Sequence, residues 1–103
     1  MNIYILEDDQ VLLDSLKEAA GHDFPLKELL NESELRGVAQ SKRVDVLLIS
    51  DKKLTPELKN IVRDITYLIV IVKDTSPLIF KKALELGAKD FLIIPLQKHE
   101  VLS

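Results

Sequence analysis

The stretch "YLIVIVKDTSPLIFKKALELGAKDFLII", residues 67–94, decides the fold that this sequence predicts. It opens with an apolar run rich in β-branched residues, 67–72, which is typical of a strand buried on both faces. Ser76 and Pro77 then supply an N-cap and a first-turn proline for a helix, and a glycine follows where that helix should end. A second apolar run, 91–94, follows the glycine. This order predicts two parallel strands joined by a crossover helix.

The same alternation extends through the rest of the chain. Apolar runs predict two more strands, at 2–6 and 44–50. Segment 24–30 is either an edge strand with a proline near its start or irregular. Caps and apolar spacing predict three further helices, which are 10–20 ending at Gly21, Asn31 (a cap paired with Glu34) to about Gln40, and one starting at Thr55-Pro56. Together these elements predict a parallel sheet with helices on both faces.

Length and composition predict that residues 1–103 form one domain with a hydrophobic core, since 47% of the residues are hydrophobic. The 14 basic and 17 acidic residues form no long block of one sign, so we expect no direct nucleic-acid binding. The sequence has no cysteine, which fits a reducing compartment, and its longest apolar run is 67–72, far too short for a bilayer. We therefore expect a cytoplasmic protein without a membrane contact.

Three adjacent acids, Glu7, Asp8 and Asp9, follow the first predicted strand. Ligand sites of such sheets lie beyond the carboxyl ends of the strands. Acids at a helix N-terminus stabilise its first turn, which explains one or two of them. Three neighbouring carboxylates repel one another and need a cation or a basic side chain nearby. Mg²⁺ at Glu7 and Asp8 is one solution, because it prefers oxygen ligands.

Three stretches resemble the signature regions of the response-regulator receiver domain of two-component signalling. They are "IYILEDDQVLLDSL" (3–16), "VDVLLISDKKLTPEL" (44–58) and "ALELGAKDFLIIPLQKHEVL" (83–102). The resemblance implies a flavodoxin-like (βα)₅ fold, a doubly wound parallel sheet of five strands in the order 2-1-3-4-5. It also implies that an acid pair holds Mg²⁺ and that an aspartate ending strand 3 accepts a phosphoryl group from a histidine kinase. In that family a Thr or Ser ends strand 4 and a Lys-Pro follows strand 5, and the hydroxyl and the lysine read the phosphoryl group.

The chain matches the scaffold of this family better than its chemistry. Glu7 and Asp8 match the acid pair, and Phe91 matches the aromatic residue that moves with the switch. Pro95 matches the proline that follows a cis bond in the family. Val72 stands where the family has the hydroxyl, and Ile94 stands where it has the lysine. Neither side chain can donate to a phosphoryl oxygen.

The phosphoacceptor position falls on Ser50 or on Asp51. In the family an aspartate lies five residues before the acceptor, and counting from Asp45 gives Ser50. Counting from Leu54, which matches a family position three residues after the acceptor, gives Asp51. Successive strand residues point to opposite faces, so only one of the two faces the acids. The loss of both phosphoryl readers favours Ser50, with Asp51 as the alternative.

Lys52 and Lys53 follow directly and have two interpretations. Both are solvated loop residues, or one ammonium reaches back to Glu7 or Asp8 and replaces Mg²⁺ and the missing lysine together. In the second case the chain needs no cofactor.

These features predict an atypical receiver, similar to orphan regulators that work without phosphorylation. It would be a regulatory protein-interaction module within a response regulator that controls transcription. The alternative is a conventional phospho-receiver that uses Asp51, Mg²⁺ and a histidine kinase. No nucleophile–base pair or Gly-rich phosphate loop accompanies Ser50 or Asp51, so we expect no catalysis beyond self-phosphorylation. A serine-phosphorylated module of the anti-sigma-antagonist type fits the order of elements less well.

We expect a protein partner or a second copy to bind at helix 4 and strand 5. A helix cannot bury Leu78, Ile79 and Phe80 on one stripe, so one of them should be exposed. The chain stops at "QKHEVLS" (97–103), which would leave the family's fifth helix truncated or missing. Either the chain is a piece of a longer regulator, or a partner or a second copy covers the surface left open, and we expect a dimer or a mixed assembly.

Overall fold

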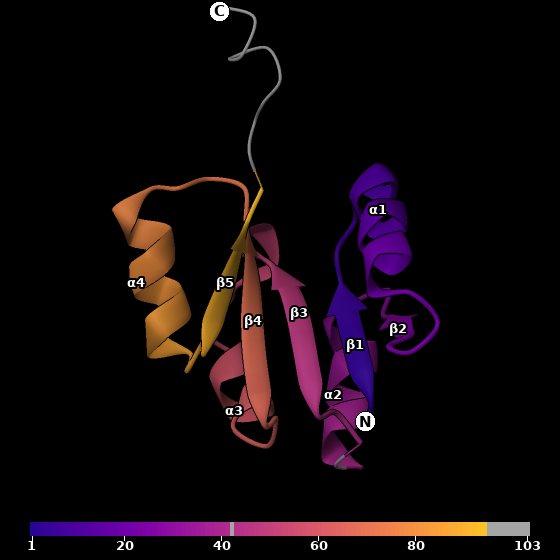
Figure 1. The fold of residues 1–103 in the computed structure, drawn as a ribbon. Helices are drawn as coiled ribbons and strands as arrows, with labels where there is room; N and C mark the ends of the chain where they lie inside the picture. Colours follow the sequence, from indigo (N-terminus) through magenta and orange to yellow (C-terminus); the bar gives the residue numbers. More distant parts are fainter. Residues whose placement is uncertain (42, 95–103) are drawn as a thin grey trace, which may run out of the picture.

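Strands and helices alternate along the chain, as the sequence predicts (Figure 1). The computed structural model describes residues 1–41 and 43–94. The strands are β1 (Ile3–Leu6), β2 (Leu26–Glu28), β3 (Val46–Ser50), β4 (Tyr67–Val72) and β5 (Asp90–Ile93). The helices are α1 (Gln10–Ala20), α2 (Glu32–Gln40), the 3₁₀ helix η1 (Asp51–Lys53), α3 (Leu58–Val62) and α4 (Pro77–Glu85).

All strand pairs are parallel, and the strand order is β2-β1-β3-β4-β5. The predicted flavodoxin-like fold is therefore confirmed. Leu6 lies beside Ile49, which lies beside Val70, so β1, β3 and β4 are in register across the centre of the sheet. Their carboxyl ends point the same way and meet at one edge, the upper edge in Figure 1.

The sheet has two unequal faces, because successive strand residues alternate between them. On one face Leu47, Ile49 and Val70 pack in a large core with side chains of α2, α3 and α4. On the other face Ile5 and Ile71 pack in a smaller core with α1. Both faces of the central strands are thus apolar, which explains why their sequences are continuous apolar runs rather than alternating ones.

Local signals in the sequence set most helix ends. The Asp9 carboxylate accepts the backbone N–H of Val11 and Leu12 at the start of α1, and the Ser76 hydroxyl accepts that of Ile79 in α4. Gly21 ends α1 with φ 72°, a conformation that favours glycine. These predicted boundaries are confirmed.

Three predictions need comment. Segment 24–30 contains the short edge strand β2, which follows Pro25 and pairs only with β1. The prediction that Thr55 caps α3 is wrong, because the cap position is Glu57. The Thr55 hydroxyl donates to Glu32 Oε1 at 2.9 Å. Helix α3 begins at Leu58 without a side-chain cap. Pro95, with its predicted cis bond, and the predicted start of a fifth helix lie outside the described residues.

Candidate functional site

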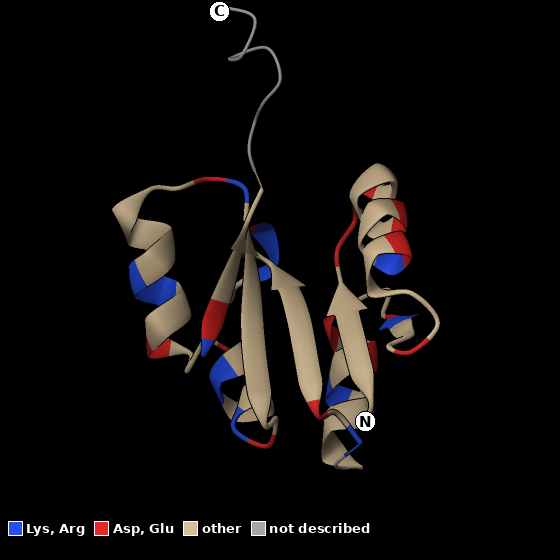
Figure 2. Ribbon diagram, in the orientation of Figure 1, with Lys and Arg blue, Asp and Glu red and all other residues tan. Residues whose placement is uncertain are grey.

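Charged side chains of both signs gather at the carboxyl edge of the sheet. Glu7 and Asp8 follow β1, Asp51 and Lys53 follow β3, and Lys73 follows β4. We call these five residues the edge cluster. Figure 2 shows the acidic segment after β1 and the basic segments after β3 and β4 at this end of the sheet.

Within the edge cluster, Lys73 links residues that follow three different strands. Its backbone N–H donates to Asp51 Oδ2 at 2.7 Å, and its ammonium donates to Glu7 Oε2 at 2.5 Å. Strands β1 and β4 are separated by β3, a distance of two strand spacings of about 4.8 Å each. The long lysine side chain spans this gap and passes over the end of β3.

Glu7 and Asp51 are both buried, although both are acidic residues. The Oε2 atom of Glu7 also accepts the backbone N–H of Asp9, at 2.9 Å. The Oδ2 atom of Asp51 accepts a second backbone N–H, that of Asp74, at 2.9 Å. The other oxygens, Glu7 Oε1 and Asp51 Oδ1, are buried and have no hydrogen-bond partner within residues 1–41 and 43–94.

The structure brings Asp51, not Ser50, to Lys73 and thereby to Glu7. Ser50 is the last residue of β3, and its buried hydroxyl accepts the backbone N–H of Lys52 at 3.2 Å. Asp51 begins η1, where the chain leaves the strand, so strand alternation no longer fixes its direction. The count from Asp45 favoured Ser50, but that carboxylate accepts the backbone N–H of Asn2 at 2.6 Å and has its own structural role.

The other predicted site residues differ in their surroundings. The Lys53 ammonium lies 2.7 Å from Asp8 Oδ2, whereas Lys52 is exposed and has no ion pair among the described residues. The Asp9 carboxylate caps α1, and only its backbone N–H contacts the edge cluster, at Glu7. One of the two lysines thus reaches back to the acids, and the other lies in solvent.

Val72 and Ile94, which the resemblance predicts to replace a hydroxyl and a lysine, are packed with apolar side chains. Val72 is fully buried in the larger core, and Ile94 is half-buried in the smaller one. The backbone N–H of Ile94 donates to the Val72 carbonyl at 2.9 Å, so the two positions are adjacent. Phe91 is half-buried and packs edge-to-face on Phe80 of α4, with ring centroids 5.1 Å apart.

The edge cluster does not fit Mg²⁺ as it is arranged. Among the described residues, no group of three or more His, Cys, Asp or Glu side chains converges as a metal site would require. The unpartnered oxygens of Glu7 and Asp51 are of the type that Mg²⁺ binds. The ammonium of Lys73 already neutralises Glu7, and that of Lys53 neutralises Asp8.

Lys73 was absent from the site predicted from the sequence. The three adjacent acids indicated that a basic side chain was needed nearby, and Lys52 and Lys53 were considered for it. Lys73 directly follows the apolar run 67–72, so its place at a carboxyl strand end was a usable signal. A search for cations after every strand, and not only after the third, would have found it.

The sequence matches no protein-family model and no curated protein. Its fold matches several solved structures. HP1043, an orphan response regulator of H. pylori, has a TM-score of 0.75 at 17% identity, with 99% of this chain and 89% of that chain covered. A pilus assembly-related protein from Burkholderia pseudomallei has a TM-score of 0.74 at 17% identity, covering 98% and 83%.

A third solved structure is a response regulator protein from Burkholderia pseudomallei with a phosphorylated aspartic acid, a calcium ion and citrate. It has a TM-score of 0.74 at 14% identity, with 98% of this chain and 64% of that chain covered. At these identities the comparisons show that the chain has the fold of receiver domains, and no more. In the described part of the chain, no helix is long and apolar enough to cross a membrane.

Proposed function

We propose that this chain is an atypical receiver domain that acts as a regulatory protein-interaction module without conventional aspartate phosphorylation. The observation that carries the proposal is the apolar packing of Val72 and Ile94. A phosphoryl group is recognised by charge-assisted hydrogen bonds, and these two positions offer no side-chain donor. A ligand that interacts equally with two states cannot shift the equilibrium between them. Phosphorylation would therefore have no switch to operate.

The proposal places Asp51 at the phosphoacceptor position, in place of Ser50. Support comes from its contacts with the backbone of Lys73 and Asp74 and from its link through Lys73 to Glu7. One carboxylate oxygen of Asp51 is already held by two N–H donors. The group is thus built into the connection between β3 and β4, where it acts as a structural ligand for the loop after β4.

The interaction surface in this proposal is the outer side of α4 with strand β5. Leu78 and Leu84 of α4 and Ile93 of β5 are exposed large apolar residues, whereas Ile79 and Phe80 are half-buried. The prediction that one of the three apolar residues opening α4 is exposed is thereby confirmed for Leu78. Such apolar residues at one surface are typical of protein contacts.

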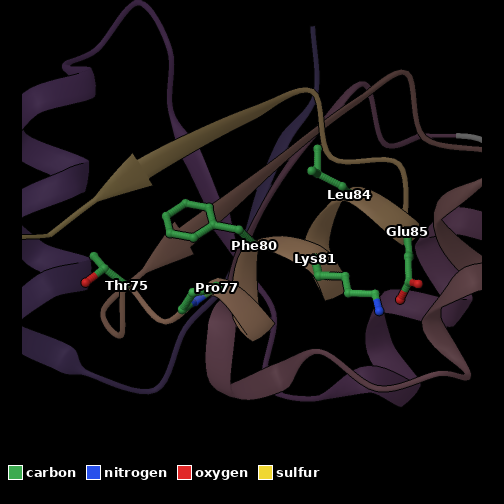
Figure 3. A pocket seen from close by; sticks show the side chains of 6 residues that line it. All are labelled: Thr75, Pro77, Phe80, Lys81, Leu84 and Glu85. Atoms are coloured by element: carbon green, nitrogen blue, oxygen red, sulfur yellow. The ribbon is translucent and has the colours of Figure 1, made fainter.

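A shallow surface pocket also lies along α4, lined by Thr75, Pro77, Phe80, Lys81, Leu84 and Glu85 (Figure 3). In Figure 3 the ring of Phe80 lies toward Thr75, and Lys81 and Glu85 extend away from it. Apolar and charged groups thus lie side by side, as in the core and rim of a protein interface. We assign this surface to a protein partner or to a second copy of the chain, as part of a cytoplasmic regulator of transcription.

A second candidate is a conventional phospho-receiver that accepts a phosphoryl group on Asp51 from a histidine kinase with Mg²⁺. The observation in its favour is the buried Asp51 Oδ1 atom, which has no partner among the described residues. A solved structure of this fold carries a phosphorylated aspartic acid and a calcium ion, as stated above for that protein.

Incubation with acetyl phosphate and Mg²⁺ separates the two candidates, with the product read by intact mass and by amide NMR spectra. We expect no phosphoryl adduct, or an adduct that leaves the amide signals of α4 and β5 unchanged. Asp51→Asn is the test variant and Ser50→Ala its matched control. An adduct that Asp51→Asn abolishes and that shifts the α4 and β5 signals would overturn the proposal in favour of the second candidate.

The proposed surface is tested by Leu84→Glu, with Val11→Glu as the control at another exposed apolar residue, on α1. We expect sedimentation to show self-association of the chain that Leu84→Glu weakens and Val11→Glu does not. A monomer at high concentration would contradict the homodimer. Equal weakening by both variants would contradict the assignment to α4.

A further inference from the structure

The ion pair of Lys73 and Glu7 is the most buried one among the described residues. The side chain of Glu7 is 1% exposed and that of Lys73 is 19% exposed. A charged carboxylate in such surroundings needs a partner, because burial removes the water that would solvate it. Lys73 supplies that partner from a strand two positions away in the sheet.

Two oxygens next to this pair still lack a partner. Glu7 Oε1 and Asp51 Oδ1 are buried and accept no hydrogen bond from any described residue. Their companion oxygens are both held by Lys73, one through its ammonium and one through its backbone N–H. Lys73 therefore binds one oxygen of each carboxylate, and the other oxygen of each has no hydrogen-bond partner among the described residues.

We propose that Lys73 is a built-in cation that keeps divalent metal ions out of the edge cluster. The carboxylates of Glu7 and Asp51 become metal ligands once the ammonium of Lys73 is removed. This inference uses only the contacts of Lys73 and holds whatever partner the chain binds.

The covalent attachment of the ammonium to the chain explains why Lys73 binds Glu7 in preference to a free metal ion. Lys73 directly follows strand β4, and its backbone N–H donates to Asp51, which holds its ammonium close to Glu7. A tethered group has a high effective concentration, whereas a free ion must be captured from solution. Mg²⁺ also loses its water ligands reluctantly. To bind Glu7, Mg²⁺ would have to displace the ammonium of Lys73 as well.

Lys53 is the natural comparison, because it pairs with Asp8 in the same cluster at 2.7 Å. The Asp8 side chain is 69% exposed, so water already solvates the charge that Lys53 neutralises. Removing Lys53 should leave Asp8 in water and change metal binding little. Lys52, which is exposed and has no ion pair among the described residues, provides a second control.

The experiment titrates the complete chain with Mg²⁺ alone, up to about 10 mM, well above the range needed to fill a carboxylate site of ordinary strength. Amide NMR signals of Glu7, Asp8 and Asp51 and the thermal unfolding midpoint are the two readouts. The variants are Lys73→Met, Lys53→Met and Lys52→Met. Methionine keeps most of the length of lysine without its charge.

We expect no saturable response in the wild type, Lys53→Met or Lys52→Met. For Lys73→Met we expect Mg²⁺ binding at least about tenfold tighter than in the wild type, and a midpoint that rises with Mg²⁺. Saturable binding by the wild type would overturn the proposal, and so would a Lys73→Met variant that gains no response. An equal gain in Lys53→Met would overturn the assignment to Lys73.

A double variant, Glu7→Gln with Lys73→Met, removes both charges of the pair. It shows whether poor folding of Lys73→Met comes from the unpaired carboxylate, because a neutral pair leaves no buried charge behind; a poorly folded Lys73→Met is then read by whether Mg²⁺ raises its unfolding midpoint. We expect it to fold without Mg²⁺ and to show no Mg²⁺ response, and a response equal to that of Lys73→Met would contradict Glu7 as a ligand. Failure of these tests would leave the argument from Val72 and Ile94 intact, since it concerns phosphoryl recognition only.

Discussion

Two lysine–carboxylate pairs lie at the same edge of the sheet and differ mainly in burial. The distance from Lys73 Nζ to Glu7 Oε2 is 2.5 Å, and that from Lys53 Nζ to Asp8 Oδ2 is 2.7 Å. The first pair is nearly enclosed, whereas Lys53 is 32% exposed and Asp8 is largely in solvent. Ion pairs of the second kind contribute little to stability, while breaking a buried pair leaves a charge without water or partner. Similar distances therefore conceal different energies, and substitutions at the four residues measure the difference.

The largest effect should come from Lys73→Met. It leaves the buried carboxylate of Glu7 without its cation, so we expect a loss of about 3–5 kcal/mol in the free energy of unfolding. Urea denaturation without divalent ions measures it. A loss as small as that of Lys53→Met would show that Glu7 is solvated or neutral in the folded protein.

Glu7→Gln should have a smaller effect, about 2 kcal/mol, because it removes charge-assisted hydrogen bonds but buries no unpaired carboxylate. The remaining ammonium of Lys73 is partly exposed and can reach water. The same urea experiment compares this variant with Asp8→Asn, the matched change at the exposed pair. Equal losses in the two variants would contradict the difference in burial.

Lys53→Met should change the free energy of unfolding by only about 0.5 kcal/mol, because its pair with Asp8 is exposed. The urea denaturation curves of Lys53→Met and of the wild type should nearly coincide. A loss above about 2 kcal/mol would place this pair in the same class as the buried one.

Salt gives the smallest and most selective test. Double-mutant cycles at about 0.05 M and about 0.5 M NaCl compare the coupling energies of the two pairs, since salt screens exposed charges more than buried ones. We expect the coupling of Lys53 with Asp8 to fall toward zero and that of Lys73 with Glu7 to remain. Loss of both couplings would show that water reaches Glu7.

The fold was largely predictable because its signals are local. The apolar run 67–72 coincides with β4, and Ser76 and Pro77 begin α4 as predicted. The prediction that Thr55 caps α3 failed, because α3 begins three residues later, at Leu58. The Thr55 hydroxyl donates instead to Glu32 of α2, a contact that neighbours in sequence do not indicate.

The candidate site was only half predictable. The place of the acids after β1 follows from strand order, whereas the roles of Val72 and Ile94 are what the resemblance to receiver domains implies. The choice between Ser50 and Asp51 does not, because it depends on where β3 ends and η1 begins. One residue of uncertainty at a strand end reverses the direction of a side chain.

The sequence by itself determined the alternation of strands and helices and the gathering of charge at one edge of the sheet, because these depend on periodicity and on residue type. That Val72 and Ile94 replace a hydroxyl and a lysine is what the resemblance to receiver domains implies. Only the tertiary structure decided that Lys73 reaches Glu7, 66 residues away, and that Asp51 receives the backbone of Lys73. Such contacts depend on strand order and register across three strands, which bring together groups that the chain itself keeps far apart.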